Sequence, residues 1–173
     1  MAFEFDATEG GASANSLCTV EFADDYFGGS LYASDWPAGS SGADLLNKQK
    51  ALVSGTRDLV RLTWQGTKTS SGQALAFPRY GLYDKDDDLI DSSTNPREIK
   101  EANCELALFK LSLDQTSIVD ESLRQFKRLK IASVIDLEMR DEKPSETGFP
   151  PQVMELIGHW LMTSGYSARL IRA

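Results

Sequence analysis

The stretch Asn95–Leu111, "NPREIKEANCELALFKL", predicts the helix around which the rest of the protein folds. Asn95 suits the cap position, Pro96 the first helical position and Glu98 the third, which is a strong helix-start signal. One apolar stripe then recurs at helical spacing: Ile99, Ala102, Leu106, Phe109 and Leu113. Leu108 and Leu111 add apolar surface outside the stripe. We therefore expect the helix over residues 96–113 to be the central, most buried one.

Other helices are expected on both sides of this one along the chain. Residues 41–64 carry apolar positions at helical spacing, and Thr19 is placed to cap a short helix over residues 20–27. Pro151 opens a last helix, over residues 151–163, that Gly165 ends. Its apolar face consists of Val153, Met154, Ile157, Trp160 and Leu161.

The period of the pattern changes in "RLKIASVIDLEMR", residues 128–140. Apolar and charged residues alternate there, which predicts a half-buried strand bent into a hairpin near Ala132 and Ser133. The expected fold class is therefore mainly α (α+β): a small helical bundle with a short β-hairpin and extended terminal arms. We expect a flexible acidic arm over residues 1–16, a helical domain over 17–163 with a hairpin insertion at about 126–140, and a basic tail over 164–173.

The loop "GQALAFPRYGLYD", Gly72–Asp84, is unusually rich in aromatic residues and has two interpretations. Its aromatic residues form an exposed recognition patch, or the loop folds back over two helices and closes their core. In the second case Arg79 forks onto backbone carbonyls or a carboxylate. We favour the second and expect a structural lock made by Gln73, Phe77, Pro78, Arg79 and Tyr80.

Size, charge and cysteine usage exclude several classes of protein. The chain has 173 residues and a net charge of −8, and no Lys or Arg occurs before Lys48. Such an acidic front end argues against a protein that grips DNA phosphates over its whole face. No apolar run is long enough to span a membrane, and the N-terminus lacks the features of a signal peptide. Cys18 and Cys104 do not make a disulfide framework, so we expect synthesis in a reducing cytoplasm.

The sequence offers no catalytic or metal-binding pattern. His159 is the single histidine, and Cys18, Cys104 and His159 do not have metal-ligand spacing. The turn "DKDDD", residues 84–88, begins like a calcium loop but has Leu89 where glycine is needed and Asn95 where glutamate is needed. We therefore expect a solvated hairpin turn there, no enzymatic activity, no cofactor and no metal.

One basic stretch, "RQFKRLK" at residues 124–130, suggests nucleic acid. Arg124, Lys127, Arg128 and Lys130 surround Phe126, a combination that suits a small platform for a DNA backbone. The alternative is a solvated strand edge, where lysine also discourages pairing with other chains, and we favour that alternative.

The order of these features resembles a bacteriophage family. "TVEFADDYF", "ALVSGTRDLVRLTW", "GQALAFPR", "NPREIKEANCELALFKL" and "PPQVMELIGHWL" follow one another as in the head–tail connector (adaptor, head completion) proteins of tailed phages. Many of those sequences carry the label "putative DnaT-like single-stranded-DNA-binding protein". The resemblance covers roughly residues 17–163. It implies a structural virion protein, made in the host cytoplasm, that forms a ring of typically twelve copies between capsid portal and tail.

The implied partners are further copies of the chain, the portal protein, and a tail terminator or next tail component. DNA passes through the lumen without sequence-specific binding, and no membrane is involved. Candidates for portal docking are Trp160, Tyr166, Arg169, Leu170, Ile171 and Arg172. Candidates for contact with neighbouring subunits or the tail are Phe126, Arg128, Lys130 and Arg140. The alternative function is that of a DnaT-like accessory protein of replication, which binds single-stranded DNA through Arg124, Lys127, Arg128 and Lys130.

Overall fold

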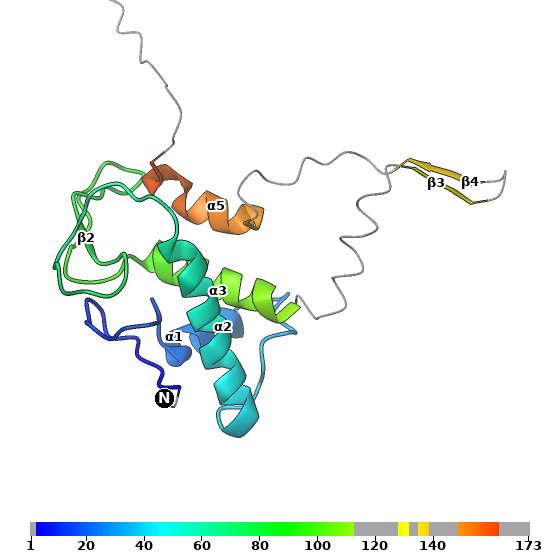
Figure 1. The fold of residues 1–173 in the computed structure, drawn as a ribbon, viewed down its shortest axis with the longest axis horizontal. Coiled ribbons are helices and arrows are strands. Elements are labelled where there is room, and N and C mark those ends of the chain that lie inside the picture. The colour runs from blue at the N-terminus through cyan, green and yellow to red at the C-terminus, as the bar shows by residue number, and fades with distance from the viewer. Residues whose placement is uncertain (1–2, 113–127, 132–134, 139–148, 163–173) are drawn as a thin grey trace, which may run out of the picture.

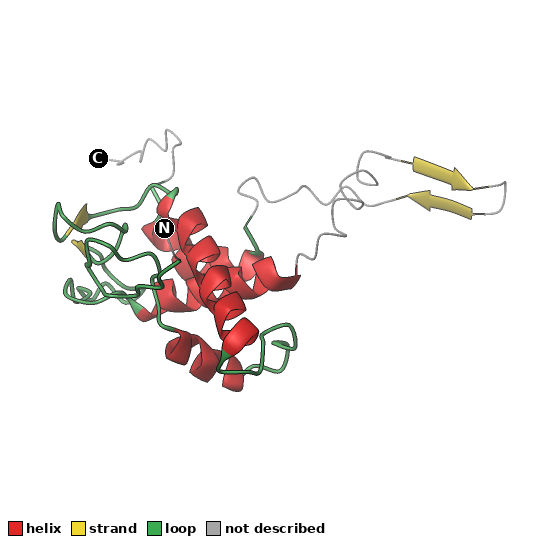
Figure 2. Cartoon of the chain, turned by 60° about the horizontal axis from the view of Figure 1, so that its bottom comes forward, coloured by secondary structure: helices red, strands yellow, loops and turns green. Residues whose placement is uncertain are grey.

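The computed structural model describes residues 3–112, 128–131, 135–138 and 149–162 (Figure 1). In these residues the helices are α1 (Val20–Gly28), α2 (Gly42–Val60), α3 (Arg97–Ser112), α5 (Pro151–Ile157) and the short 3-10 helix η3 (Gly158–Trp160). The strands are β1 (Thr67–Lys68), β2 (Arg79–Tyr80), β3 (Arg128–Ile131) and β4 (Ile135–Glu138). The expected class, mainly helical with a small antiparallel hairpin, is confirmed (Figure 2). No helix in the described ranges is both long and apolar enough to cross a bilayer.

Helix α3 lies at the centre, as its apolar pattern predicts, and contacts α1, α2 and α5. It contributes to two separate apolar clusters. Its Ile99, Ala102 and Leu106 join the end of α2, the Gly72–Asp84 loop and α5, whereas Cys104 and Ala107 join α1 and the middle of α2. Phe109 was expected in the buried stripe but is 36% exposed, because α5 covers only the first part of α3. Leu113 lies outside the described residues.

The start of α3 differs from the expectation. The carbonyl of Pro96 accepts the first helical bonds, from the backbone N–H of Ile99 (3.1 Å) and Lys100 (3.2 Å), so the helix begins at Arg97. Asn95 does not cap it. The Asn95 side-chain amide instead donates to the carbonyl of Leu17 (2.9 Å), a buried acceptor that needs a partner. Thr19, by contrast, caps α1 as expected and accepts from the N–H of Phe22 (3.2 Å).

Both helices that were expected to continue past residue 60 or 157 end early, for one shared reason. The segment after α2 and the segment after α5 exchange backbone hydrogen bonds: Gln65 N donates to the Trp160 carbonyl (2.9 Å) and Met162 N to the Thr63 carbonyl (2.9 Å). Trp64 and Leu161 also form an isolated antiparallel bridge, which the helical backbone expected at these residues could not make. Helix α2 ends at Val60 rather than at residue 64, and after α5 ends at Ile157 the helical path continues only through η3 to Trp160 rather than to residue 163.

The N-terminal segment is not the free arm that its composition suggested. Phe5 packs against the cluster around α1, Ala14 is buried, and Leu17 is fully buried. The carbonyl of Asp6 accepts from the backbone of Asn15 (2.8 Å) and Ser16 (3.0 Å), which folds the segment on itself. Glu9 then forms an ion pair with Lys100 on α3 (2.6 Å). Local hydrogen bonds and long-range contacts thus hold a segment that consists mainly of small and polar residues. The long-range contacts include the Glu9–Lys100 ion pair, the bond from Ala74 N to the Gly11 carbonyl (3.0 Å) and the packing of Phe5.

The predicted hairpin is present in β3 and β4. These strands pair antiparallel with Arg128 opposite Glu138 and Ile131 opposite Ile135. The connection at residues 132–134, including the expected turn at Ala132 and Ser133, lies outside the described residues.

Candidate functional site

The Gly72–Asp84 loop is held by one arginine. The Arg79 guanidinium donates to four backbone carbonyls, those of Gln65 (2.7 Å), Gly66 (2.7 Å), Ala76 (3.1 Å) and Trp64 (3.3 Å). The sequence left open whether Arg79 donates to backbone carbonyls or to a carboxylate, and the structure shows that it donates to carbonyls. Partial burial lowers the pKa of Arg79 from its ordinary value, but guanidinium groups stay charged in proteins. The segment has almost no regular secondary structure, so its carbonyls lack the partners that a helix or sheet would give them. The Arg79 side chain supplies those hydrogen bonds instead.

Gln73 and Phe77 complete the loop. The Gln73 side chain is buried and accepts from the Thr69 hydroxyl (2.8 Å) while donating to the Pro78 carbonyl (3.1 Å). Phe77, which precedes a cis peptide bond to Pro78, is 1% exposed and packs edge-on against Trp64 with ring centroids 4.8 Å apart. Tyr80 was expected in the lock but is 54% exposed. Its backbone pairs with Thr67, which leaves its ring at the surface.

Trp160 was expected to dock on a portal, and the structure places it in the core. It is 1% exposed, and its indole N–H donates to the carbonyl of Tyr83 (2.6 Å). A buried ring that joins η3 to the Gly72–Asp84 loop cannot face a partner, so this candidate was wrong. The other portal-docking candidates, Tyr166, Arg169, Leu170, Ile171 and Arg172, lie outside the described residues.

The basic candidates on the hairpin stand in register with acidic residues. Arg128 of β3 is opposite Glu138 of β4, and Lys130 is opposite Asp136. The two strands together therefore carry no net charge, which weakens the interpretation of this stretch as a platform for phosphates. Phe126 and Arg140 lie outside the described residues, as do Arg124 and Lys127.

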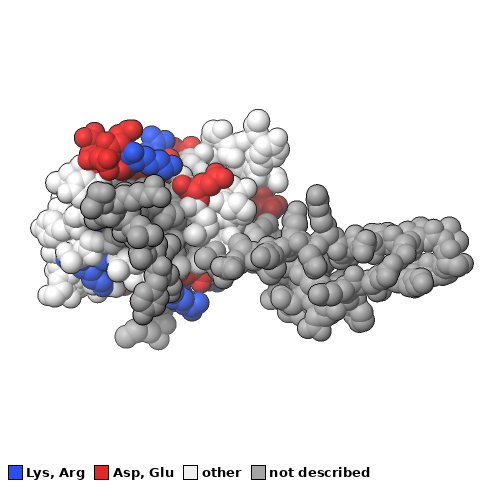
Figure 3. All heavy atoms as spheres, turned by 90° about the horizontal axis from the view of Figure 1, so that it is seen from above, with Lys and Arg blue, Asp and Glu red and all other residues white. Residues whose placement is uncertain are grey.

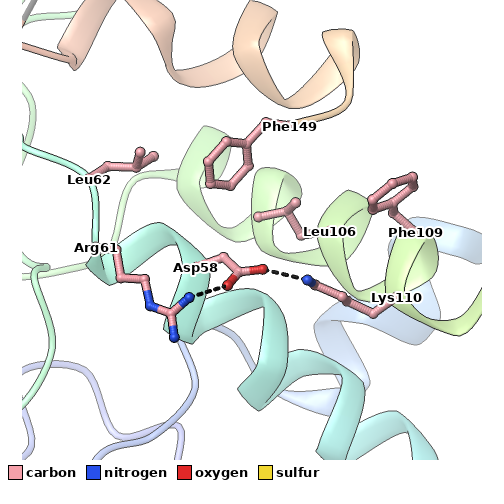
Figure 4. A pocket seen from close by; sticks show the side chains of 7 residues that line it. All are labelled: Asp58, Arg61, Leu62, Leu106, Phe109, Lys110 and Phe149. Carbon is pink, nitrogen blue, oxygen red and sulfur yellow. Dashed lines mark hydrogen bonds and ion pairs between the residues drawn. The ribbon is translucent and has the colours of Figure 1, made fainter. Parts of the chain in front are cut away.

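A hollow of about 250 Å³ opens between the end of α2, the end of α3 and the start of the last helical segment (Figure 4). Leu62, Leu106, Phe109 and Phe149 supply its apolar wall. On its rim the Asp58 carboxylate accepts from Lys110 (2.7 Å) and Arg61 (3.4 Å). Because both cations already face this carboxylate, the hollow suits an apolar side chain better than a phosphate. Its sequence positions gave no signal, since Phe149 is distant from the other residues along the chain.

Exposed apolar side chains lie in two other places. Leu31 and Tyr32, in the loop between α1 and α2, are 91% and 88% exposed. Trp36 of the same loop is, by contrast, only 9% exposed and packs in the cluster around α1. The second place is the hairpin turn at Asp84–Asp88, where Tyr83 and Leu89 pair across the turn and are both exposed.

The acidic turn uses one of its carboxylates to shape the backbone. Asp84 Oδ1 accepts from the N–H groups of Asp86 (2.9 Å) and Asp88 (2.9 Å), as in a solvated turn. Within the described residues no three metal-ligating side chains gather in one place. His159 lies against Trp160, and burial, with Lys85 second, lowers its pKa. These groups do not assemble into an acid–base or nucleophilic constellation.

Acidic residues dominate the described surface. Residues 3–112 contain 17 Asp and Glu against 10 Lys and Arg. Five of these ten bases form ion pairs with carboxylates: Lys48, Arg61, Arg97, Lys100 and Lys110. Figure 3 shows one face, on which acidic side chains gather in one group at an edge. A continuous basic groove that would follow a nucleic-acid backbone is not found among the described residues.

Comparison with known proteins gives one match. No solved structure and no curated protein matches the chain. One family model, described as "Putative DnaT-like ssDNA binding protein", matches residues 1–173, the whole chain. The chain therefore belongs to the DnaT-like single-stranded-DNA-binding protein family as that description names it.

Proposed function

We propose that this protein is a structural subunit of a phage head–tail connector, which assembles as a ring on the portal and surrounds the DNA channel. The observation that carries the proposal is the charge of the body. Its acidic residues outnumber its basic ones, and half of the bases in residues 3–112 are neutralised by carboxylates. An acidic wall repels DNA, so DNA can slide past it.

Two structural features support assembly through side chains. Leu31 and Tyr32 stand almost fully exposed, and the hollow beside Phe149 offers an apolar wall. A protruding apolar pair and an apolar hollow made by different residues suit head-to-tail contacts between copies, and such contacts close into rings when the rotation closes. The hairpin residues and the tail over 164–173 remain our candidates for reaching the neighbour and the portal.

Co-sedimentation with the cognate portal ring tests this role. We expect saturable binding by the full chain, and loss of binding without loss of folding when residues 164–173 are deleted. A circular dichroism spectrum and a melting curve of the truncated chain serve as the folding control. If the full chain does not sediment with the portal, the connector role is wrong. If the truncated chain binds normally, the tail assignment alone is wrong.

The second candidate is binding of single-stranded DNA, and the family description supports it more directly than it supports the connector. Arg124, Lys127, Arg128 and Lys130 are the residues that would contact phosphates. Fluorescence anisotropy of a labelled oligonucleotide at physiological salt tests it. Binding that weakens steeply with salt and is lost in the fourfold glutamine variant, without portal association, favours this candidate over the connector. Absence of binding even at low salt excludes it.

A further inference from the structure

Two thiols lie face to face in the interior, although 86 positions separate them in sequence. The Sγ atoms of Cys18 and Cys104 are 3.8 Å apart, and both cysteines are free. Cys18 directly precedes Thr19, the cap of α1, whereas Cys104 belongs to the middle of α3. Both residues are buried, at 3% and 0% exposure. The pair therefore spans the junction between the N-terminal segment and the central helix.

The backbone around Cys18 is fixed from several directions. The Ser16 hydroxyl donates to the Cys18 carbonyl (2.7 Å), and Leu17 N donates to the Thr56 hydroxyl of α2 (3.1 Å). The amide of Asn95, just before α3, donates to the Leu17 carbonyl (2.9 Å). These three bonds hold Cys18 against α3 independently of its own side chain. The proximity of the two sulfurs is thus a property of the packed fold rather than of one rotamer.

The surroundings also favour a reactive sulfur at Cys18. The amide of Asn103 points a donor at Cys18 Sγ (3.4 Å). The hydrogen bond from Cys104, opposed by burial and helped by Asn103 and the charge of Lys100, lowers the pKa of Cys18. The same pairing raises the pKa of Cys104. Of the two sulfurs, Cys18 is therefore the one that loses its proton more readily.

We propose that Cys18 and Cys104 form a redox modification site, which closes to an intramolecular disulfide when a small two-electron thiol oxidant reaches it. With an azo oxidant such as diamide, the Cys18 thiolate adds to one nitrogen of the N=N bond. The Cys104 sulfur then attacks the Cys18 sulfur, the S–N bond breaks and the S–S bond forms. The two thiols lose two electrons and two protons, and both pass to the oxidant, which leaves as a hydrazine. Closure needs the sulfurs to approach from 3.8 Å to about 2.05 Å.

Access to the buried pair depends on the N-terminal segment. Glu9 holds this segment on α3 through its ion pair with Lys100 (2.6 Å) and its bond from Asn95 N (3.1 Å). Because residues 3–17 directly precede Cys18, we infer that their local opening lets an oxidant meet Cys18 without global unfolding. Once formed, the disulfide ties this segment covalently to α3 until a reductant opens it. The inference is independent of whether the protein acts as a connector or binds DNA.

Diamide treatment of the native full-length protein tests the site. We expect an intact mass lower by about 2 Da, no thiol left for maleimide after denaturation, and no covalent dimer. Because the bond closes a long loop, the melting temperature should rise by about 5–10 °C and return when a reductant is added. Cys18→Ala and Cys104→Ala variants, checked for folding by circular dichroism, should show no intramolecular product.

Three results would overturn the proposal: both thiols surviving diamide in the native protein, a bond forming only at denaturant concentrations that unfold the chain, or dimers as the sole product. The access route has its own test. Glu9→Gln should accelerate native-state oxidation several-fold, whereas Glu4→Gln, an exposed neighbour, should not. Equal rates in the two variants would show that the Glu9 contacts do not control entry.

Discussion

Two irregular segments of this protein contain similar residues, but one buries its apolar side chains and the other exposes them. The segment between α2 and α3 buries Phe77 and Leu82, whereas the loop between α1 and α2 leaves Leu31 and Tyr32 in solvent. Both contain aromatic residues, glycine and proline. They differ in the donors that their side chains aim at backbone. Arg79 donates to four backbone carbonyls in the first segment. In the second segment Trp36 donates to the Asp24 carboxylate (2.7 Å), and Asp44 Oδ2 accepts from Gly39 N (3.1 Å).

The comparison indicates what turns a loop into part of a core. An irregular segment can be buried only if its backbone groups find partners. Arg79 and Gln73 supply these partners, so the aromatic residues near them can leave water. The loop between α1 and α2 lacks such a donor around Leu31, and its tip stays exposed. Mutations in the two segments should therefore differ strongly in cost.

The largest effect is expected for Phe77→Ala. Phe77 is buried and packs on Trp64, so its removal leaves a cavity between α2 and the loop. We expect a loss of about 4 kcal/mol in the free energy of unfolding, measured by urea titration. Phe77→Leu, which keeps most of the volume, should lose clearly less. Equal losses in both variants would mean that the ring itself, rather than filled space, is needed.

Arg79→Ala should have the next largest effect, a loss of about 3 kcal/mol in the free energy of unfolding, because it leaves carbonyls beneath the loop without a donor. Arg79→Lys keeps the charge, but a lysine cannot donate to several carbonyls at once. This variant should therefore recover only a minor part of the stability that Arg79→Ala loses. If lysine restores full stability, the charge matters rather than the fork, and the contrast between the two segments loses its explanation.

Asp24→Asn tests the anchor that Trp36 gives to the exposed loop. Asp24 accepts from Trp36 (2.7 Å) and from Lys48 (2.7 Å), and Lys48 is 2% exposed. The variant leaves a buried ammonium without its counter-ion, so we expect a loss of about 2 kcal/mol. The double variant Asp24→Asn with Lys48→Met should be more stable than Asp24→Asn alone. If it is not, the ion pair is not what holds Trp36 in place.

Most elements of the fold could be predicted from sequence, because their signals are local. The α3 pattern, the Thr19 cap and the β3–β4 hairpin depend on neighbouring residues, and each was confirmed. The failures at the ends of the helices involve distant partners. Asn95 does not cap α3, because its side-chain amide donates to the Leu17 carbonyl. Helix α2 ends early because the residues after it pair with the residues after α5. Residue spacing carries no information about such bonds.

The candidate site was less predictable than the fold. The sequence indicated that Arg79 would fork onto backbone carbonyls or a carboxylate, and the structure shows the carbonyls. Trp160, which the family resemblance offered for portal docking, is buried together with Val153 and Ile157 of the same apolar face. The hollow beside Phe149 was missed, since its walls come from three segments. A site of this kind is made by packing, so it becomes visible only when the helices are in place.

A smaller, pH-dependent effect is expected at His159. Burial and Lys85 lower its pKa below the ordinary 6.5, although Glu98 and Asp84 act in the opposite direction. A depressed pKa means that the unfolded chain binds the proton more readily, so His159 contributes stability above about pH 6.5 that is lost as the pH falls through its folded pKa. We expect wild type to lose slightly more stability than His159→Gln between about pH 7.5 and about pH 5. Parallel urea curves at the two pH values would contradict this.

The smallest effect is expected in the exposed loop. Leu31→Ser and Tyr32→Ser remove side chains that are 91% and 88% exposed, so each should change the free energy of unfolding by less than about 0.5 kcal/mol. The same substitutions should weaken binding to the portal ring or to further copies, if exposed apolar groups at this position serve assembly. Unchanged stability with impaired assembly would separate a segment that builds the fold from one that meets a partner. A loss above about 1 kcal/mol in the free energy of unfolding would show instead that this loop stabilises the fold as the Gly72–Asp84 loop does.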